Sequence, residues 1–327
     1  MKHIFIVNPN AGQGRAVETI RSQLSALGSD IESEIYLTKG KGDAKAYIEH
    51  RLSESNTPIR FYACGGDGTV NEVINGIAPF SHSEFSVFPC GSGNDFVKCF
   101  GQGEAFLDIK SLVYGKTHDI DIIKVNDRYC INVCNFGLDA NVVRIMEKVK
   151  NKFFLGGKNA YLTGVAVSFI TSMCNHATVF ADGKKLNNGR FLLCTIANGQ
   201  YVGGQFKCAP RARVNDGWLD ICLVDTVSRF TFLRLVKSYA EGQHLDDVRF
   251  KNIIRYTRCK RVEIVADENF IISLDGELIN SPHTIVEVMP NAARIAVPQK
   301  ISEKYFYDPN LNGEEISGYH NEQSFIK

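Results

Sequence analysis

One segment constrains the fold more than any other: an apolar run that ends in a glycine-rich turn and continues as a helix. Arg60 to Cys64 has the composition of a buried strand, and Gly65-Gly66-Asp67-Gly68-Thr69 follows directly. Glycines let backbone N–H groups approach a ligand closely, and the following helix directs its partial positive charge to the same point. The segment predicts a phosphate-binding unit with Asp67 beside the phosphates. An ordinary strand-to-helix turn is the alternative.

The N-terminal third of the chain alternates strand-like and helical segments. Strands are expected at Ile4 to Val7, Ile31 to Leu37, Ile59 to Cys64 and Phe85 to Phe88, with helices at Arg15 to Leu27, Asp43 to Leu52 and Val70 to Ile77. This pattern predicts a parallel sheet covered by helices on both faces. Such sheets bind ligands beyond the carboxyl ends of their strands. One cleft is expected to use three loops: Asn8 to Gly12, Gly65 to Thr69, and Gly91 to Asp95.

The third of these loops repeats the order of strand, glycine turn and helix within Val87 to Phe96. Ser92 offers a hydroxyl to a phosphate oxygen, and Asn94 and Asp95 lie at or near an expected helix N-cap, placed to position metal or substrate. Taken alone, the loop is equally compatible with a turn and a cap. Two such loops in one parallel-sheet domain favour a nucleotide-binding cleft.

Beyond about Asp119 the pattern changes to short alternating strands joined by polar turns, which predicts an antiparallel β-sandwich. Its strands are expected at Ile120 to Val125, Tyr129 to Asn135, Ala177 to Phe180, Arg190 to Ile196, Trp218 to Val224, Arg261 to Ala266, Phe270 to Leu274 and Thr284 to Val288. Helices are expected at about Asn141 to Lys150, Ala160 to Cys174 and Arg229 to Tyr239.

The length of 327 residues is enough for two cores. We expect a nucleotide-binding α/β domain over residues 1–122 and a β-sandwich substrate domain over residues 123–298. The tail over residues 299–327 is expected to pack back on the first domain, with a frayed end.

Composition excludes several classes of protein. A net charge of +1, with 22% charged and 44% hydrophobic residues, gives no field strong enough to predict nucleic-acid binding. The apolar run at Ile4 to Val7 is too short for a signal peptide, and no run is apolar enough for a membrane span. The ten scattered cysteines are expected to be reduced thiols. A cytoplasmic protein is therefore expected.

A pair of carboxylates near the C-terminus is the next candidate for chemistry. Asp275 and Glu277 flank Gly276 at the end of an expected strand. Asp-Gly in an antiparallel sheet is commonly just a hairpin turn. If the hairpin faces the phosphate cleft, Glu277 or Asp275 can accept the proton of a substrate hydroxyl as it attacks a γ-phosphate.

Two further segments allow a functional and a structural interpretation. The turn from Ala209 to Asp220 carries Asp216, which together with nearby carbonyls suits a hard cation such as Mg²⁺, although a plain turn has the same composition. A basic cluster suits an anionic lipid surface, and a solvated helix end is its alternative. The cluster comprises Lys148, Lys150, Lys152 and Lys158 around Phe153-Phe154-Leu155.

Together these motifs resemble the soluble diacylglycerol kinase family of lipid kinases, in order and in spacing. The segments that carry the resemblance are Gly65 to Val73, Gly91 to Phe96, Asp216 to Asp220 and Leu274 to Glu277. The resemblance extends from Asn8-Pro9 to about Pro298. It implies an N-terminal α/β domain like those of NAD kinase and phosphofructokinase, a C-terminal antiparallel β-sandwich, and an active site in the cleft between them.

The resemblance also implies roles for individual residues. Glu277 matches the proton acceptor with Asp275 beside it, and Asp67 lies near the phosphates. A structural Mg²⁺ site matches Asp216 and the backbone carbonyls of Arg213 and Trp218. The positions that match nucleotide contacts in the family are Asn8, Pro9, Asn10, Ala11, Gly12, Thr38, Gly65, Gly66, Asp67, Gly68, Thr69, Val70, Asn71 and Ser92. Asn94 and Asp95 of the third loop, expected from their place near a helix N-cap, complete the nucleotide-binding set.

Two positions depart from the family pattern. Ser92 stands where threonine is usual and keeps the hydroxyl. Ala11 stands where a small polar residue is common, which removes one phosphate hydrogen bond.

The expected reaction is transfer of the γ-phosphoryl group of ATP to the hydroxyl of a lipid, with Mg²⁺ as cofactor. The expected lipid is diacylglycerol, which would yield phosphatidic acid. The expected enzyme is peripherally membrane-associated and meets its lipid at the membrane surface, and a homodimer is a further expectation. An NAD kinase is one alternative, because it shares Gly-Gly-Asp-Gly-Thr. A silent nucleotide- or lipid-binding regulator is another, although it would be expected to lack Asp67, Asp275 or Glu277.

Overall fold

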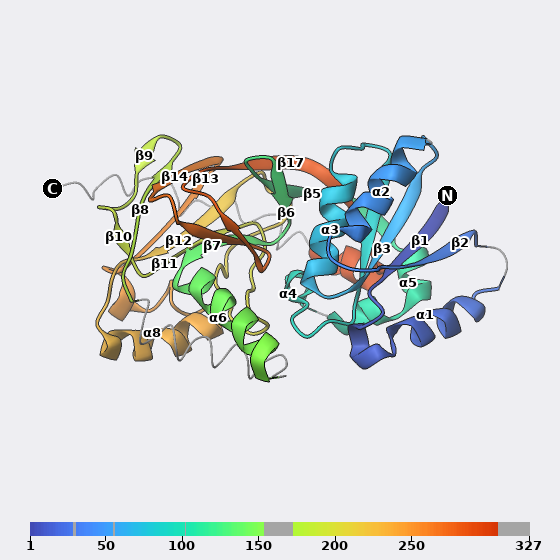
Figure 1. Cartoon of the computed structure of the whole chain (residues 1–327), viewed down its shortest axis with the longest axis horizontal. Coiled ribbons are helices and arrows are strands. Elements are labelled where there is room, and N and C mark those ends of the chain that lie inside the picture. Colours follow the sequence, from blue (N-terminus) through green and yellow to red (C-terminus); the bar gives the residue numbers. More distant parts are fainter. Residues whose placement is uncertain (29–30, 55, 102, 154–172, 307–327) are drawn as a thin grey trace.

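The computed structural model describes residues 1–28, 31–54, 56–101, 103–153 and 173–306, which form two domains side by side (Figure 1). The N-terminal domain is built on parallel strands in the order β4-β3-β1-β2. These are β1 (Lys2–Val7), β2 (Ser33–Leu37), β3 (Ile59–Gly65) and β4 (Ser83–Pro89). The central strands β1, β3 and β4 are almost wholly buried, as expected when helices cover both faces of a parallel sheet.

Helices cover this sheet on both sides. Helix α2 (Asp43–Glu54) packs on α3 (Asp67–Ile77), and α1 (Ala16–Ser25) packs on α5 (Ile109–Val113) across the sheet (Figure 1). The short α4 (Asp95–Lys98) follows the loop after β4. Further helical turns span Ala11–Gly14, Gly103–Leu107, Val248–Phe250, Gln299–Ile301 (α9) and Ser302–Phe306.

The C-terminal domain consists of two packed antiparallel layers. The first is a six-stranded sheet in the order β13-β12-β11-β7-β15-β16. Its strands are β13 (Ile254–Cys259), β12 (Leu219–Val224), β11 (Leu193–Ala197), β7 (Val133–Gly137), β15 (Ile271–Leu274) and β16 (Glu277–Asn280). The second layer comprises β5 (Lys116–Val125), β6 (Arg128–Cys130), β8 (Asn175–Ala181), β9 (Lys184–Lys185), β10 (Arg190–Phe191), β14 (Arg261–Ala266) and β17 (His283–Val297). An apolar core that includes Phe136, Ile221 and Val262 fills the space between the layers. The predicted fold class, α/β followed by an antiparallel β-sandwich, is confirmed.

One strand belongs to both domains. Strand β17 pairs with β14 and β5 in the C-terminal domain, and at Ile295 it pairs with Phe85 of β4 in the N-terminal domain. The second layer and the parallel sheet are therefore one continuous sheet. Strand β5 runs through the expected boundary at residue 122, and β17 is shared by both domains. The division at residues 122 and 298 therefore stays a prediction.

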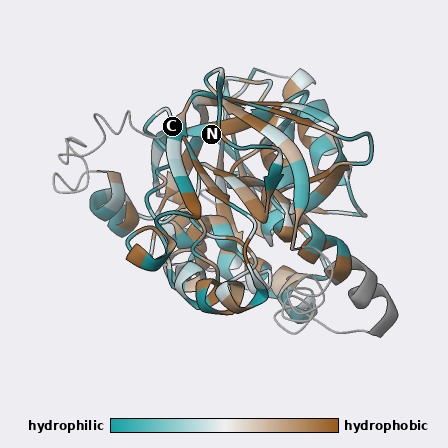
Figure 2. Cartoon of the chain, turned by 90° about the vertical axis from the view of Figure 1, so that its left-hand side faces the viewer, coloured by the Kyte–Doolittle hydropathy of each residue, from teal (hydrophilic) through white to brown (hydrophobic). Residues whose placement is uncertain are grey.

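Two helices cover the outer face of the six-stranded sheet, α6 (Leu138–Phe153) and α8 (Arg229–Glu241). Both reach the lower edge of the C-terminal domain (Figure 1). Figure 2 shows the sheets of this domain from the side, with hydrophobic and hydrophilic residues alternating along the strands. No helix within the described residues is long and apolar enough to cross a membrane.

The chain departs from the sequence-based strands at several points. The strand expected at Tyr129 to Asn135 is broken into β6 and β7. Strands β13 and β16 were not expected, because their residues are largely half-buried and polar. The strand expected at Thr284 to Val288 continues as β17 to Val297. Residues 299–306 pack against the N-terminal core through Ile301, Tyr305 and Phe306, and residues 307–327 lie outside the described part of the chain.

Candidate active site

A pocket of about 640 Å³ lies where the two domains meet. The N-terminal domain lines it with the loops that follow β1, β2, β3 and β4, which are the carboxyl ends of the parallel strands. The C-terminal domain lines it with residues 132–133, 202–204, 273 and 275–277 and with Val143 of α6. Segments far apart in the sequence thus form one cleft.

Glycines bring two of these loops into direct contact. A Cβ atom on Gly91 would lie 2.3 Å from the Cα atom of Gly66, and a Cβ atom on Gly93 would lie 2.5 Å from Asp67 Oδ2. Because the clash at Gly91 is with backbone, this position requires glycine, and a side chain at Gly93 would displace the Asp67 carboxylate. The Gly65–Thr69 and Gly91–Asp95 loops therefore form one surface.

Backbone amides on this surface are available to an anion. The N–H groups of Thr69 and Val70 donate to Gly66 O, at 3.0 and 3.2 Å. Those of Asp67 and Gly68, at the start of α3, donate to no residue that the structure describes. Unpaired amides at a helix N-terminus attract phosphate by hydrogen bonding and by the helix dipole.

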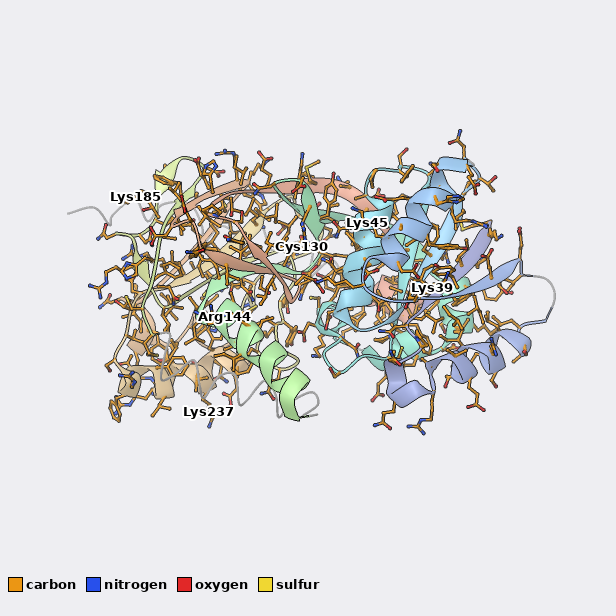
Figure 3. The ribbon with its side chains drawn as sticks, in the orientation of Figure 1. Lys39, Lys45, Cys130, Arg144, Lys185 and Lys237 are labelled. Atoms are coloured by element: carbon orange, nitrogen blue, oxygen red, sulfur yellow. The ribbon has the colours of Figure 1, made fainter. Side chains whose placement is uncertain are left out.

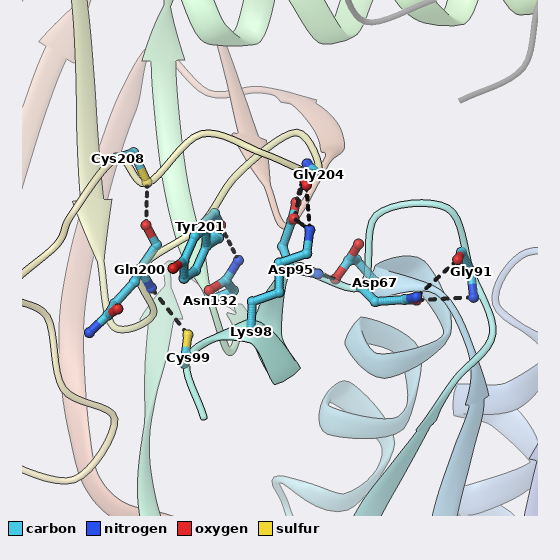
Figure 4. Close-up of polar contacts among 11 residues, drawn as sticks. Asp67, Gly91, Asp95, Lys98, Cys99, Asn132, Gln200, Tyr201, Gly204 and Cys208 are labelled. Carbon is cyan, nitrogen blue, oxygen red and sulfur yellow. Dashed lines mark hydrogen bonds and ion pairs between the residues drawn. The ribbon is translucent and has the colours of Figure 1, made fainter. Parts of the chain in front are cut away.

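Asp67 is the carboxylate nearest to these amides. Its Oδ1 atom accepts a hydrogen bond from the Asp95 N–H at 2.6 Å, and its Oδ2 atom accepts none from a described residue (Figure 4). Burial, and then the negative charge of Asp95, raise the pKa of Asp67 to about 7. A carboxylate held in this way is poised to change protonation near neutral pH.

Asp95 and Lys98 join the nucleotide-side loop to the other domain (Figure 4). The Gly204 N–H donates to Asp95 Oδ1 and Oδ2, at 2.9 and 3.1 Å. Lys98 Nζ donates to Asp95 Oδ1 at 2.7 Å and to Gly204 O at 2.6 Å. This contact fixes residues 203–204 against the glycine loops.

Asp275 is saturated with donors. Its carboxylate accepts hydrogen bonds from the N–H groups of Ile131, Asn132 and Val133, at 2.9 to 3.0 Å, and from Asn71 Nδ2 at 3.0 Å. Asp275 has a positive φ of 50° at the turn between β15 and β16, so the predicted hairpin is present. With four donors, this side chain positions the hairpin on α3 and has no free oxygen for proton transfer.

Glu277 lines the pocket, and its carboxylate accepts no hydrogen bond from a backbone N–H group of the described residues. It forms an ion pair with Lys41, which comes from the loop after β2 on the opposite wall. Its side chain is 32% exposed. The loop that carries Lys41 is held in turn by Glu72 of α3, which accepts from Gly42 N–H at 2.8 Å and Ala44 N–H at 3.0 Å.

Most of the predicted nucleotide-contacting residues line the pocket. They are Asn8, Pro9, Asn10, Ala11, Thr38, Gly66, Asp67, Gly68, Thr69, Ser92 and Asp95. Gly12, Gly65, Val70, Asn71 and Asn94 are not among the lining residues. Asn94 does not cap α4 with its side chain; it holds Gly91 instead, through a pair of hydrogen bonds of 2.9 and 3.0 Å.

The predicted Mg²⁺ residues lie outside the pocket, and the fit to a cation is poor. Asp216 Oδ1 accepts from the Trp218 N–H at 3.1 Å, and Asp216 Oδ2 contacts the Arg258 guanidinium. The neighbouring Asp121 carboxylate accepts from the N–H groups of Gly217 and Asn291. With Arg258 supplying the positive charge, the carboxylate oxygens at this site have donors already. Metal binding through Arg213, Asp216 and Trp218 stays a prediction.

Sequence reasoning missed several residues of the cleft. Lys39, Lys41 and Glu72 line it, although no role was expected for them. A signal was present in Lys39-Gly40-Lys41-Gly42, a glycine-rich loop that follows a parallel strand like the other three. The basic cluster around Phe153-Phe154-Leu155, with Lys148, Lys150, Lys152 and Lys158, lies outside the residues whose side chains are described.

Comparison with known proteins agrees with this arrangement of domains. Residues 2–125 match the diacylglycerol kinase catalytic domain, and residues 132–297 match the YegS C-terminal NAD kinase beta sandwich-like domain. The chain is 31% identical to a diacylglycerol kinase of Bacillus subtilis (strain 168), over 84% of this chain and 88% of that protein. It is 26% identical to a diacylglycerol kinase of Staphylococcus carnosus (strain TM300), over 84% and 87%.

Solved structures share the fold. One structure from Bacillus anthracis str. Sterne aligns with a TM-score of 0.72 at 27% identity, covering 92% of this chain and 98% of that one. Another, of a diacylglycerol kinase from the same source, aligns with a TM-score of 0.68 at 24% identity over the same shares. The protein is thus a kinase that acts on lipids. The chain belongs to the diacylglycerol kinase family.

Proposed function

We propose that this lipid kinase transfers the γ-phosphoryl group of ATP to the free hydroxyl of diacylglycerol and so forms phosphatidic acid. The observation that carries the proposal is the composition of the cleft: a glycine cradle with unpaired amides forms one wall, and Glu277 reaches in from the other. Phosphoryl transfer needs positioning and charge stabilisation more than covalent chemistry, and these walls provide both.

On the nucleotide side, the amides of Asp67 and Gly68 bind phosphate oxygens, and the Ser92 hydroxyl adds a donor. Mg²⁺ bound to the nucleotide neutralises phosphate charge when present. Asp67 is the residue that supports such an ion, because its Oδ2 atom accepts no hydrogen bond from a described residue. Lys39 and Lys41 are the cationic side chains that line the cleft within the described residues, and they balance the remaining charge.

On the acceptor side, Glu277 takes the proton of the lipid hydroxyl as its oxygen attacks the γ-phosphorus. The new P–O bond forms while the bond to the β-phosphate oxygen breaks, and the electron pair of that bond leaves with ADP. Asp275 does not exchange protons in this scheme. It holds the hairpin so that Glu277 faces the phosphate.

The C-terminal wall favours a lipid acceptor over NAD. Val133, Val143 and Val202 give this wall an apolar part, beside the polar side chains of Asn132, Ser273, Asp275 and Glu277. A nicotinamide nucleotide carries ribose hydroxyls and phosphates that require polar partners, whereas a glycerol backbone with acyl chains suits an apolar wall. This observation supports a lipid acceptor over NAD.

The test is transfer of labelled γ-phosphate from Mg-ATP to a panel of lipids in mixed micelles, with NAD as a separate acceptor. We expect label in diacylglycerol and a loss of at least about a hundredfold in kcat for Glu277→Gln. Glu268→Gln, which changes an exposed carboxylate near the same hairpin, is the matched control. Label in NAD alone would make the protein an NAD kinase. Tight ATP binding with no labelled acceptor would make it a silent regulator.

A further inference from the structure

Helix α8 has an outer face of unusual composition. Its inner face, with Phe232, Leu235 and Tyr239, is buried in the core of the C-terminal domain. On the outer face, Phe230 is 64% exposed and Leu233 is 58% exposed. Within the described residues Phe230 is the one phenylalanine among the exposed large apolar side chains.

Cations surround these two apolar side chains. Arg229, Arg234 and Lys237 are all exposed, and the Arg234 guanidinium lies 4.1 Å from the centre of the Phe230 ring. Arg234 and Lys237 form no ion pair with a described residue. The helix contains no acidic residue before Glu241, its last position. The protein as a whole is almost neutral, so this positive charge is local.

We propose that the outer face of α8, defined by Arg229, Phe230, Leu233, Arg234 and Lys237, docks on the surface of an anionic phospholipid bilayer. The proposal rests on the lipid-kinase function, since the acceptor lies in a membrane. A helix with aromatic and aliphatic side chains between basic ones lies in the plane of the membrane interface. Its apolar groups enter the acyl boundary and its cations meet the headgroups.

A second copy of the chain fits this face poorly. A two-fold symmetric contact would bring Arg234 and Lys237 against the same cations of the other copy, and like charges repel. A bilayer of phosphatidylglycerol instead offers negative charge at the headgroups and apolar surface beneath. Helix α8 lies on the lower edge of the domain, where Lys237 is found, whereas Lys185 lies at the upper edge (Figures 1 and 3).

The test is co-sedimentation of the full chain with vesicles of phosphatidylglycerol and phosphatidylcholine in equal parts, and with vesicles of phosphatidylcholine alone. We expect binding to the mixed vesicles, weakened by salt, and little binding to the neutral ones. The variant Phe230→Ser with Leu233→Ser should bind about tenfold more weakly or worse. Its control, Leu107→Ser with Val265→Ser, removes two exposed apolar side chains elsewhere and should bind normally.

Charge is tested separately. Arg234→Gln with Lys237→Gln should lose most of the salt-sensitive binding, whereas Lys184→Gln with Lys185→Gln, an equal change of charge on β9, should not. Unchanged vesicle binding in both α8 variants, or equal binding of the wild type to neutral and anionic vesicles, overturns the proposal. So does a wild-type dimer, measured by light scattering, that the Phe230→Ser, Leu233→Ser variant converts to a monomer.

Activity distinguishes this proposal from the proposed function. The α8 variants should phosphorylate a dispersed short-chain diacylglycerol at the wild-type rate and lose activity on long-chain diacylglycerol in anionic vesicles. Equal losses on both substrates contradict docking through α8. If no lipid is phosphorylated at all, the function fails, and the vesicle-binding arm still decides whether α8 docks.

Discussion

Asp67 illustrates how one side chain gains a functional property from its surroundings. Its pKa, raised to about 7 by burial and by Asp95, places its ionisation near neutral pH. Because the ionised carboxylate is the form that would hold the Mg²⁺ of the nucleotide, kcat/KM should fall as the pH drops below about 7. Removing the negative neighbour with Asp95→Asn lowers the pKa, so the acidic limb should move to lower pH. An acidic limb that stays in place in this variant contradicts the assignment; the control is Asp127→Asn, at an exposed turn.

Asp139 is a second buried carboxylate, with a consequence for stability. It lies at the start of α6, 6% exposed, with Thr195 Oγ1 at 3.5 Å, and burial raises its pKa from 3.8 to about 7. Between these values the folded protein binds more protons than the unfolded chain, so the free energy of unfolding falls as pH rises through this window.

Replacement of Asp139 by asparagine removes this penalty. Between about pH 5 and pH 8, Asp139→Asn should gain on the order of 1–3 kcal/mol of stability relative to the wild type. Urea unfolding at the two pH values measures the difference. An equal difference at both would show that Asp139 does not ionise in this range, and Asp127→Asn again serves as the exposed control.

At the scale of elements, an ion pair joins strands and helix in the first domain. Arg60 of β3 donates to Glu84 of β4 at 2.8 Å and to the carbonyls of Leu112 and Val113 at the end of α5. Both charged side chains are almost fully buried. Arg60→Met leaves Glu84 buried without its main partner. The free energy of unfolding should therefore fall by about 3–5 kcal/mol. Arg294 is half-exposed and lies 3.7 Å from the same carboxylate. Arg294→Met should therefore lower the free energy of unfolding by less than about 1 kcal/mol.

The Lys41–Glu277 ion pair links a loop of one domain to a hairpin of the other. Lys41 is 77% exposed, so the pair contributes little to stability. Its expected effect is on activity: Lys41→Met should lower kcat about tenfold or more with an unchanged melting temperature, and Lys41→Arg should restore most of it. Lys45→Met, which removes a surface pair with Glu49 on α2, is the control. A change confined to KM would place Lys41 in ground-state binding only.

Individual helices, strands and turns show most clearly what could be predicted from the sequence. The glycine turn at Gly65 to Thr69 and the Asp275-Gly276 hairpin were predicted correctly, because glycine and Asp-Gly specify local backbone geometry. Strand β13 was not, since it is polar and half-buried at an edge. The four donors to Asp275 could not be predicted either, because they come from residues more than a hundred positions away. Long-range pairing leaves no local pattern.

At the scale of the whole molecule, β17 makes the two cores dependent on each other. The strand pairs with β14 and β5 in one domain and with β4 in the other. Unfolding either domain exposes the ladder of the other, so we expect one calorimetric transition with equal van't Hoff and calorimetric enthalpies. Two separated transitions would contradict this expectation. Asn71→Ala, which removes a contact between the domains outside β17, should lower the melting temperature and keep a single transition.

The contact from Asp67 through Asp95 to Gly204 has a consequence for the order of events in catalysis. A nucleotide whose bound Mg²⁺ attracts Asp67 would alter the hydrogen bond from the Asp95 N–H to this carboxylate. Asp95 in turn fixes the loop at residues 203–204 beside Val202 on the acceptor wall. The two substrates are then thermodynamically coupled. By reciprocity, if bound ATP raises the affinity for the acceptor by some factor, the bound acceptor raises the affinity for ATP by the same factor. Such synergy would favour the complex that contains both substrates over the complex with ATP alone.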